Sequence, residues 1–141
     1  MTEARNLTAS FTLNTYALNI STTGQGSVIG AGTYSHDDLA TISAVPSTGF
    51  SFLNWEGNGI SDIQSATTTV SMTEDRNLTA IFGTNSYSLL VSAGNGGTVT
   101  GSGTFSHGSE ASVEAIPATG YSFVSWSGEG IKPAGVDKDA K

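Results

Sequence analysis

The sequence predicts an all-β protein built from two tandem small β units, and three observations lead to this fold class. Apolar and polar residues alternate along several segments, which is the two-residue period of a half-buried strand. Gly contributes 18 of the 141 residues and charged residues only 12%, whereas soluble domains average about 25% charged residues. A long stretch of the chain also repeats itself, so the same small unit is expected twice.

The repeat covers most of the chain. Residues 2–60 align without a gap on residues 73–131, at an offset of 71 (73 − 2), and about half of the aligned positions are identical, which indicates a duplication. Units of roughly 70 residues bury only about 60% of their chain surface and are marginally stable alone. Neighbouring repeats are therefore expected to stabilise one another.

The first half of each unit is predicted to be strands separated by glycine. In the first copy an alternating strand is centred on Leu18, and a segment over residues 26–34 places glycine at alternate positions, which suggests a close backbone approach or a bulge. A further strand around Ile42 ends at Pro46. The glycine-rich segment 94–97 is expected to be a hairpin turn, because Asn-Gly is a strong hairpin signal.

The second half of the unit begins with a turn that contains Gly49 and continues into an aromatic strand ending at Trp55. The spacing changes from two to three residues before Trp55, which predicts a β-bulge. A turn at residues 57–59 and short strands at 68–72 and 78–82 follow, giving roughly six strands per unit. The predicted core consists of Tyr16, Leu18, Ile20, Ile42, Phe50, Phe52 and Trp55.

These strands predict a β-grasp-like or mini-sandwich unit, in an elongated arrangement of two units. Residues 1–12 are interpreted as the terminal strand of a preceding repeat, or as the first strand of unit one. Residues 13–83 form a complete repeat, and residues 84–141 a second repeat lacking its usual closing strand. Head-to-tail self-association through residues 5–11 would complete that second unit, although fraying of both ends is the favoured outcome.

Composition excludes several classes of partner. The net charge of −7 and the pI near 4.4 leave no basic surface for nucleic acid, and no run of apolar residues is long enough for membrane insertion. The chain contains no cysteine, which excludes thiol catalysis and a disulfide framework. The N-terminal residues lack the apolar segment of a signal peptide.

Few residues are candidates for a functional site. Trp55 and Trp126 occupy equivalent positions, and an exposed tryptophan could stack on a sugar, but core anchoring is the favoured interpretation because tryptophan supplies the largest apolar surface. His36 and His107 also match, yet their neighbouring residues differ, so turn residues are favoured over a metal site. No catalytic, cofactor-binding or metal-binding residue is predicted, and none of the acidic groups has a recognisable calcium-binding spacing.

The repeated pattern resembles a known family. Both copies contain Y-x-L-x-V or its equivalent, then G-x-V-x-G-x-G-x-Y/F, then A-x-P-x-x-G-Y/F-x-F-x-x-W-x-G, and N-L-T-A-x-F forms the closing strand of the first copy. This order is similar to the divergent internalin B-type repeats, also called Listeria–Bacteroides repeats. The resemblance runs from Tyr16 to Phe82 and again from Tyr87 to Gly128, and the second copy departs from it after Ile131.

The resemblance implies a non-catalytic repeat that serves as a spacer, stalk or adhesion module of a bacterial surface or secreted protein. It implies an extracellular or cell-surface location, with neighbouring repeats of the parent protein as the first partners and a host or polysaccharide ligand as a further one. The alternative is a carbohydrate- or protein-binding module that uses exposed Trp55 and Trp126. The family has no established catalytic residues, so the chain is not expected to be an enzyme.

Overall fold

The structure is a computed structural model that describes residues 1–131. It contains only strands and connecting segments in that range, so the all-β prediction is confirmed. The chain divides into two compact units. Unit 1 comprises Met1–Ser86 with Ser106–Gly108, and unit 2 comprises Tyr87–Phe105 and the described residues from Ser109 onward.

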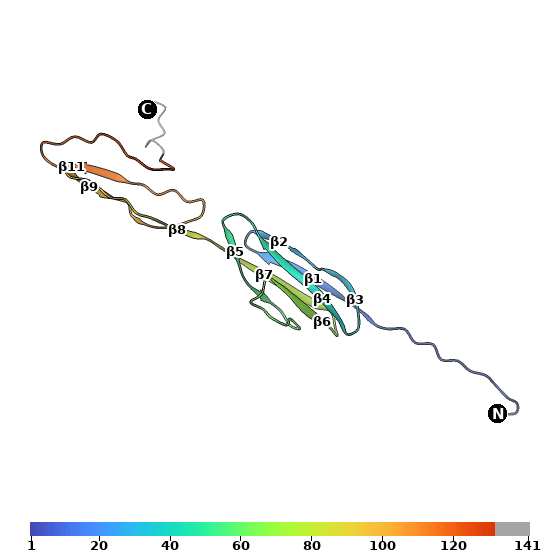
Figure 1. Cartoon of the computed structure of the whole chain (residues 1–141). Helices are drawn as coiled ribbons and strands as arrows, with labels where there is room; N and C mark the ends of the chain where they lie inside the picture. The colour runs from blue at the N-terminus through green and yellow to red at the C-terminus, as the bar shows by residue number, and fades with distance from the viewer. Residues whose placement is uncertain (132–141) are drawn as a thin grey trace, which may run out of the picture. The chain divides into compact units, whose positions relative to one another are not determined.

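Unit 1 is built from two sheets (Figure 1). The first sheet has the strand order β3-β1-β7-β5 and the second has the order β2-β4-β6. The strands are β1 (Thr15–Thr23), β2 (Gly26–Ile29), β3 (Gly32–Ser35), β4 (Asp38–Pro46), β5 (Phe50–Glu56), β6 (Thr67–Met72) and β7 (Arg76–Thr84). Both sheets contribute inward side chains to one core, so the unit is a small β-sandwich. The β-grasp alternative is wrong, because it needs a helix across its sheet and unit 1 contains none.

The core of unit 1 lies between the two sheets. Its fully buried hydrophobic members are Leu18, Ala40, Ile42, Ala44, Trp55, Val70, Met72, Leu78, Ala80 and Phe82. Three of the predicted core residues belong to this set, whereas Tyr16, Ile20, Phe50 and Phe52 are only half-buried. The predicted core did not include the residues of β6 and β7, which supply half of the buried hydrophobic side chains.

Strand β7 is the central element of the first sheet. It pairs in parallel with β1, from Leu18 opposite Arg76 to Thr23 opposite Ile81, and antiparallel with β5. Its residues alternate strictly between buried and less buried positions, as expected for a strand with one face on the core. The last strand of the repeat, β7, thus lies between β1 and β5 and completes the first sheet.

Two local predictions about strand geometry have different outcomes. The β5–β7 register shifts between Phe52 and Asn54, so the predicted bulge before the tryptophan is confirmed. The glycine-alternating segment 26–34 is not one strand, because it divides into β2 and β3, which belong to different sheets. Gly30 lies between them with a φ of +116°, and a Cβ there would come within 2.5 Å of the Thr41 carbonyl oxygen. Unit 1 therefore has seven strands rather than six.

The predicted hairpin turns are also wrong in one respect. Residues 57–59 begin the connection from β5 to β6, which extends to residue 66, and residues 94–97 lead from β8 (Ser86–Leu89) into β9 (Gly97–Thr100). In each case the two strands belong to different sheets. The glycines do turn the chain, with φ of +129° at Gly57 and +103° at Gly96. Each turn crosses between sheets instead of joining two paired neighbours.

Unit 2 repeats part of this architecture. Besides β8 and β9 it contains β10 (Gly103–Ser106) and β11 (Glu114–Pro117), which pair as β10-β8 and β11-β9. The β9–β11 register, with Gly97 opposite Pro117, is equivalent to that of β2 and β4, with Gly26 opposite Pro46. Up to residue 131, no side chain that belongs to unit 2 is fully buried.

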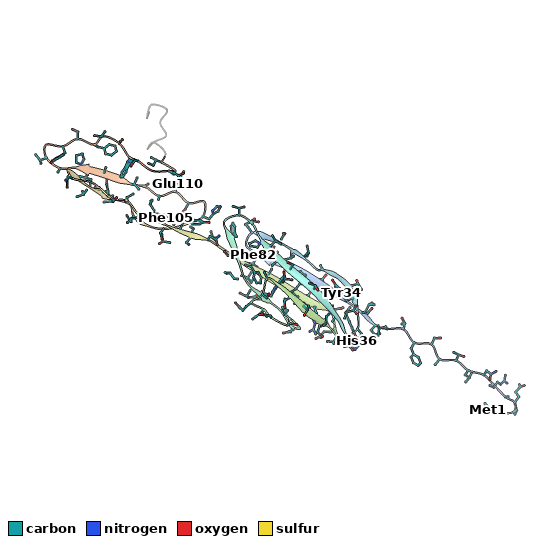
Figure 2. The ribbon with its side chains drawn as sticks, in the orientation of Figure 1. Met1, Tyr34, His36, Phe82, Phe105 and Glu110 are labelled. Atoms are coloured by element: carbon teal, nitrogen blue, oxygen red, sulfur yellow. The ribbon has the colours of Figure 1, made fainter. Side chains whose placement is uncertain are left out.

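Residues 1–14 form no strand, and every one of them is exposed. In Figure 1 this segment runs away from the two sheets of unit 1 as a single trace. The first strand of unit 1 begins at Thr15 and not within residues 1–12. The segment joins β1 beside His36 (Figure 2). The backbone N–H of His36 donates to the Asn14 carbonyl at 2.8 Å.

Candidate functional site

Trp55 is a core residue. Its side chain is 1% exposed, its ring packs against Phe52 with centroids 5.5 Å apart, and its indole Nε1–H donates to the Ser65 carbonyl at 2.9 Å. This burial agrees with the favoured interpretation of Trp55 as a core anchor, and it leaves no exposed ring for the alternative of ligand stacking at this position. A small sandwich gains more from burying the largest aromatic side chain, provided that its N–H finds a partner.

Trp126 has the same local contact but a different environment. Its ring packs against Phe123 with centroids 5.7 Å apart, matching the pair in unit 1, yet the tryptophan is only half-buried. It lines an open groove of about 450 Å³ within unit 2, together with Leu90, Val91 and Phe123. This groove occupies the position that is filled in unit 1 by β7 and the core around it.

The groove has both polar and apolar walls. Backbone from residues 90–97 and 122–127 lines two sides of it, and Ala115 to Pro117 form another part. Several apolar side chains beside it are largely exposed: Leu90 is 86% exposed and Val124 is 90% exposed. Part of the lining backbone is already hydrogen-bonded, since the Val91 N–H donates to Ser102 Oγ at 2.9 Å and the Ala118 N–H donates to the Gly96 carbonyl at 2.8 Å.

The histidine at position 36 behaves as a turn residue. Its Nε2 lies 3.5 Å from Asp37 Oδ1, and Asp37 adopts a φ of +71° in the turn between β3 and β4. Asp38 accepts the Ser35 backbone N–H at 2.8 Å. His107, the equivalent residue, has its ring against Phe50 with centroids 6.5 Å apart. The two histidines thus contribute to local structure at separate turns.

The acidic residues that could serve as calcium ligands each make a separate local contact. Asp62 accepts the Gln64 backbone N–H at 2.9 Å, Asp75 accepts the Ala17 N–H at 2.8 Å, and Glu74 pairs with Arg76. Among residues 1–131 no three His, Cys, Asp or Glu side chains gather at one point. In the same range, no helix has the length and apolar character needed to cross a membrane.

Arg76 is a structural residue that the sequence analysis missed. It is only 9% exposed, and it donates from Nε to the Ser71 carbonyl at 3.1 Å, from Nη1 to Glu74 at 2.7 Å and from Nη2 to Thr73 at 3.0 Å. The signal was available, because an arginine stands at the same place before N-L-T-A in both copies. An arginine that is repeated before the same N-L-T-A sequence indicates that its side chain has a structural role in the complete repeat.

Comparison with known proteins gives one match. The family described as divergent InlB B-repeat domain matches residues 16–86 and again residues 87–140. No curated protein and no solved structure shows significant similarity to the chain. The two matched segments follow each other directly and together cover most of the sequence, in agreement with the duplication and with the two units. The chain therefore belongs to the divergent InlB B-repeat family, a family of generally non-catalytic repeats found in bacterial surface proteins.

Proposed function

We propose that this chain is a non-catalytic spacer or adhesion module of a bacterial surface or secreted protein, acting outside the cell. The observation that supports the proposal is the burial of Trp55. The largest aromatic side chain of unit 1, which would be the best ligand platform, is buried in the core with its only polar atom hydrogen-bonded.

The polar residues of unit 1 support the same role. Ser and Thr hydroxyls pair across neighbouring strands, as between Ser21 and Thr79 at 3.0 Å and between Ser43 and Thr67 at 3.0 Å. Carboxylates cap turns or accept single backbone N–H groups. Such side chains strengthen a sheet without creating a reactive centre, which suits a module whose task is to position other parts of a protein.

Small-angle scattering tests the spacer role. A single compact globule of this length has a radius of gyration of about 14 Å, whereas a spacer requires successive units arranged end to end. We expect a radius of gyration clearly above the globular value, measured at the lowest usable concentration so that any association is excluded. A value near that of a globule would contradict the spacer role.

Because Trp55 is buried, the alternative function as a ligand-binding module depends on Trp126 alone. Its groove in unit 2 is open and has exposed apolar walls, which is the observation that favours a ligand. The variant Trp55→Phe leaves Trp126 as the sole tryptophan, so titration with soluble polysaccharides should change its emission if sugars bind there. Unchanged emission across a panel of polysaccharides would rule out carbohydrate as the ligand of this groove.

A further inference from the structure

Two Asn-Gly peptides occur in the chain, at residues 58–59 and 95–96. In such a peptide the backbone nitrogen of glycine can attack the side-chain carbonyl carbon of asparagine, because glycine has no Cβ to block the approach. The new N–Cγ bond closes a five-membered succinimide ring. The bond from Cγ to the side-chain nitrogen breaks, and that nitrogen leaves as ammonia with the proton of the glycine N–H. Water then opens the ring and leaves a carboxylate.

The first of these peptides lies in unit 1, in the turn that follows β5. Asn58 is exposed, and Gly59 has a φ of +85°. The Gly59 carbonyl accepts the Ser71 backbone N–H at 2.9 Å, so the chain after Asn58 is anchored to β6. Asn58 lines a small polar cavity of about 240 Å³ together with Gly57, Glu74, Asp75, Arg76 and Asn77.

The guanidinium group of Arg76 lies beside the reacting peptide. A Cβ on Gly59 would come within 2.8 Å of its Cζ and Nε and 3.0 Å of its Nη2. Ring closure removes a proton from the Gly59 nitrogen and places negative charge on the Asn58 side-chain oxygen, and a fixed positive charge nearby stabilises both. The two carboxylates of the cavity are already engaged, Glu74 by Arg76 at 2.7 Å and Asp75 by the Ala17 N–H at 2.8 Å.

Arg76 also has donors left for the product. Its Nε, Nη1 and Nη2 donate to Ser71, Glu74 and Thr73. Each terminal nitrogen of a guanidinium group has two N–H groups, so within residues 1–131 one N–H on each remains for a further acceptor. A carboxylate formed at position 58 supplies that acceptor at the edge of the same cavity, and hydrogen bonds between ionised partners are the strong ones.

The second copy of the repeat carries an acid at this point. With the offset of 71, the residue equivalent to Asn58 is Glu129, and the residue equivalent to Gly59 is Gly130. Glu129 is exposed, and Gly130 has a φ of +77°, close to that of Gly59. A carboxylate before this glycine is thus compatible with the local conformation of the turn.

We propose that Asn58-Gly59 is a self-modification site of the folded protein. The Asn58 side chain closes on the Gly59 nitrogen with release of ammonia, and water opens the ring at Cγ to leave a carboxylate that binds Arg76. Opening at the other ring carbonyl would add a methylene to the main chain and displace Gly59 from Arg76 and Ser71, so the fold disfavours it. Unit 1 thereby gains one negative charge with age, a property that is independent of the spacer role.

The second Asn-Gly peptide is an internal reference. Asn95 is exposed like Asn58, Gly96 has a φ of +103°, and the Gly96 carbonyl accepts the Ala118 N–H at 2.8 Å. The difference lies in the neighbour, because a Cβ on Gly96 would meet the Tyr121 ring instead of a guanidinium group. The two sites therefore share the reacting sequence and an anchored glycine, and they differ in the nearby charge.

Mass spectrometry of proteolytic peptides measures both conversions in the full chain during incubation at mildly alkaline pH. In concentrated urea the two asparagines should convert at similar rates, since each precedes glycine. In the native chain Asn58 should convert at least about threefold faster than Asn95. Equal native rates, or an Asn58 that stays unconverted while Asn95 reacts, would overturn the proposal.

The variant Asn58→Asp tests whether the product binds Arg76. We expect a higher urea midpoint than for the parent chain at neutral pH. The guanidinium group lowers the pKa of the new carboxyl in the folded state, so this gain should be lost as the pH falls through that pKa. The matched control is Asn77→Asp, which adds the same charge beside the cavity, although the Asn77 Oδ1 already accepts from Asn19 at 3.1 Å. A midpoint for Asn58→Asp equal to or below that of the control would overturn the binding of the product.

The chemical form of the product tests the direction of ring opening. Fragment masses distinguish aspartate from isoaspartate, in which the main chain runs through the side-chain carbonyl. The share of aspartate at position 58 should be larger after conversion in the native chain than after conversion in urea. The same share under both conditions would overturn the preference for opening at Cγ.

Discussion

The guanidinium group of Arg76 lies directly against Gly59, where a Cβ would come within 2.8 Å of both Cζ and Nε of the arginine. Gly59 has a φ of +85°, so glycine is favoured there for its conformation as well as for its size. Arg76 starts β7, and its hydrogen bonds reach the end of β6 and the turn that follows it. This pair therefore ties the central strand to the loop after β5 and to the opposite sheet.

The first prediction concerns Arg76. Arg76→Ala removes three hydrogen bonds and the packing of a long aliphatic stem, so we expect the free energy of unfolding of unit 1 to fall by about 2–3 kcal/mol. Urea denaturation followed by circular dichroism measures it. The matched control is Arg5→Ala, since Arg5 has the same sequence context but is exposed, and it should change stability by less than about 0.5 kcal/mol. Equal effects of the two variants would contradict a structural role specific to the buried arginine.

The second prediction concerns Gly26, which lies under the Phe82 ring. A Cβ at Gly26 would come within 2.5–2.7 Å of three ring atoms, so Gly26→Ala forces the ring to move. The expected loss is about 1–3 kcal/mol of stability. The control is Gly94→Ala, because no heavy atom of residues 1–131 lies within 4 Å of a Cβ at Gly94, and this change should be neutral.

A double-mutant cycle attributes that loss to the ring. Phe82→Leu shortens the side chain over Gly26, so the cost of Gly26→Ala should become smaller in the Phe82→Leu background. Thermal denaturation of the four proteins provides the coupling energy. Additive effects would mean that the cost of Gly26→Ala arises from the backbone of β2 and not from contact with Phe82.

The fold class and the strand content could be predicted from the sequence because both follow from local periodicity. The bulge before Trp55 was predictable for the same reason, since a change of spacing is visible in the residues themselves. The turn that contains Gly49 was also predictable, and it has a φ of +85° with the Phe50 N–H donating to the Ser47 carbonyl at 3.0 Å. All of these features depend on residues that are close in sequence.

The order of strands in the sheets could not be predicted, because it depends on pairing between distant segments. Leu18 lies opposite Arg76, and no local pattern indicates that a closing strand inserts beside the first one in parallel. The division of residues 26–34 between two sheets had a local signal in Gly30, but alternate glycines also suit a single strand with a close neighbour. Core anchoring was the favoured interpretation for both tryptophans, and it holds for Trp55, which is 1% exposed. The half-buried state of Trp126 could not be predicted, since burial depends on which strands cover the ring.

The third prediction separates the two tryptophans. In Trp126→Phe, the remaining Trp55 should emit at short wavelength and resist quenching by acrylamide, because its ring is 1% exposed. In Trp55→Phe, the remaining Trp126 should be quenched more strongly, since it lines an open groove. Trp55→Phe should also lower the stability of unit 1 by about 1–3 kcal/mol, because it removes core volume and leaves the Ser65 carbonyl without the indole donor. Equal quenching of both variants would contradict the difference in burial.

The fourth prediction uses the two nearly identical segments as internal controls for each other. In dilute protein, the amides of β7 should exchange with deuterium slowly, because β7 is central in its sheet and paired on both sides. The amides of residues 5–13 should exchange at nearly the rate of an unstructured chain, since these residues are exposed and form no strand. Because local composition hardly differs between R-N-L-T-A-S-F and R-N-L-T-A-I-F, any difference in rate reports pairing alone. Mass spectrometry of peptic peptides resolves the two segments by their differing sixth residue. Slow exchange of both segments would contradict the exposed state of the N-terminal segment.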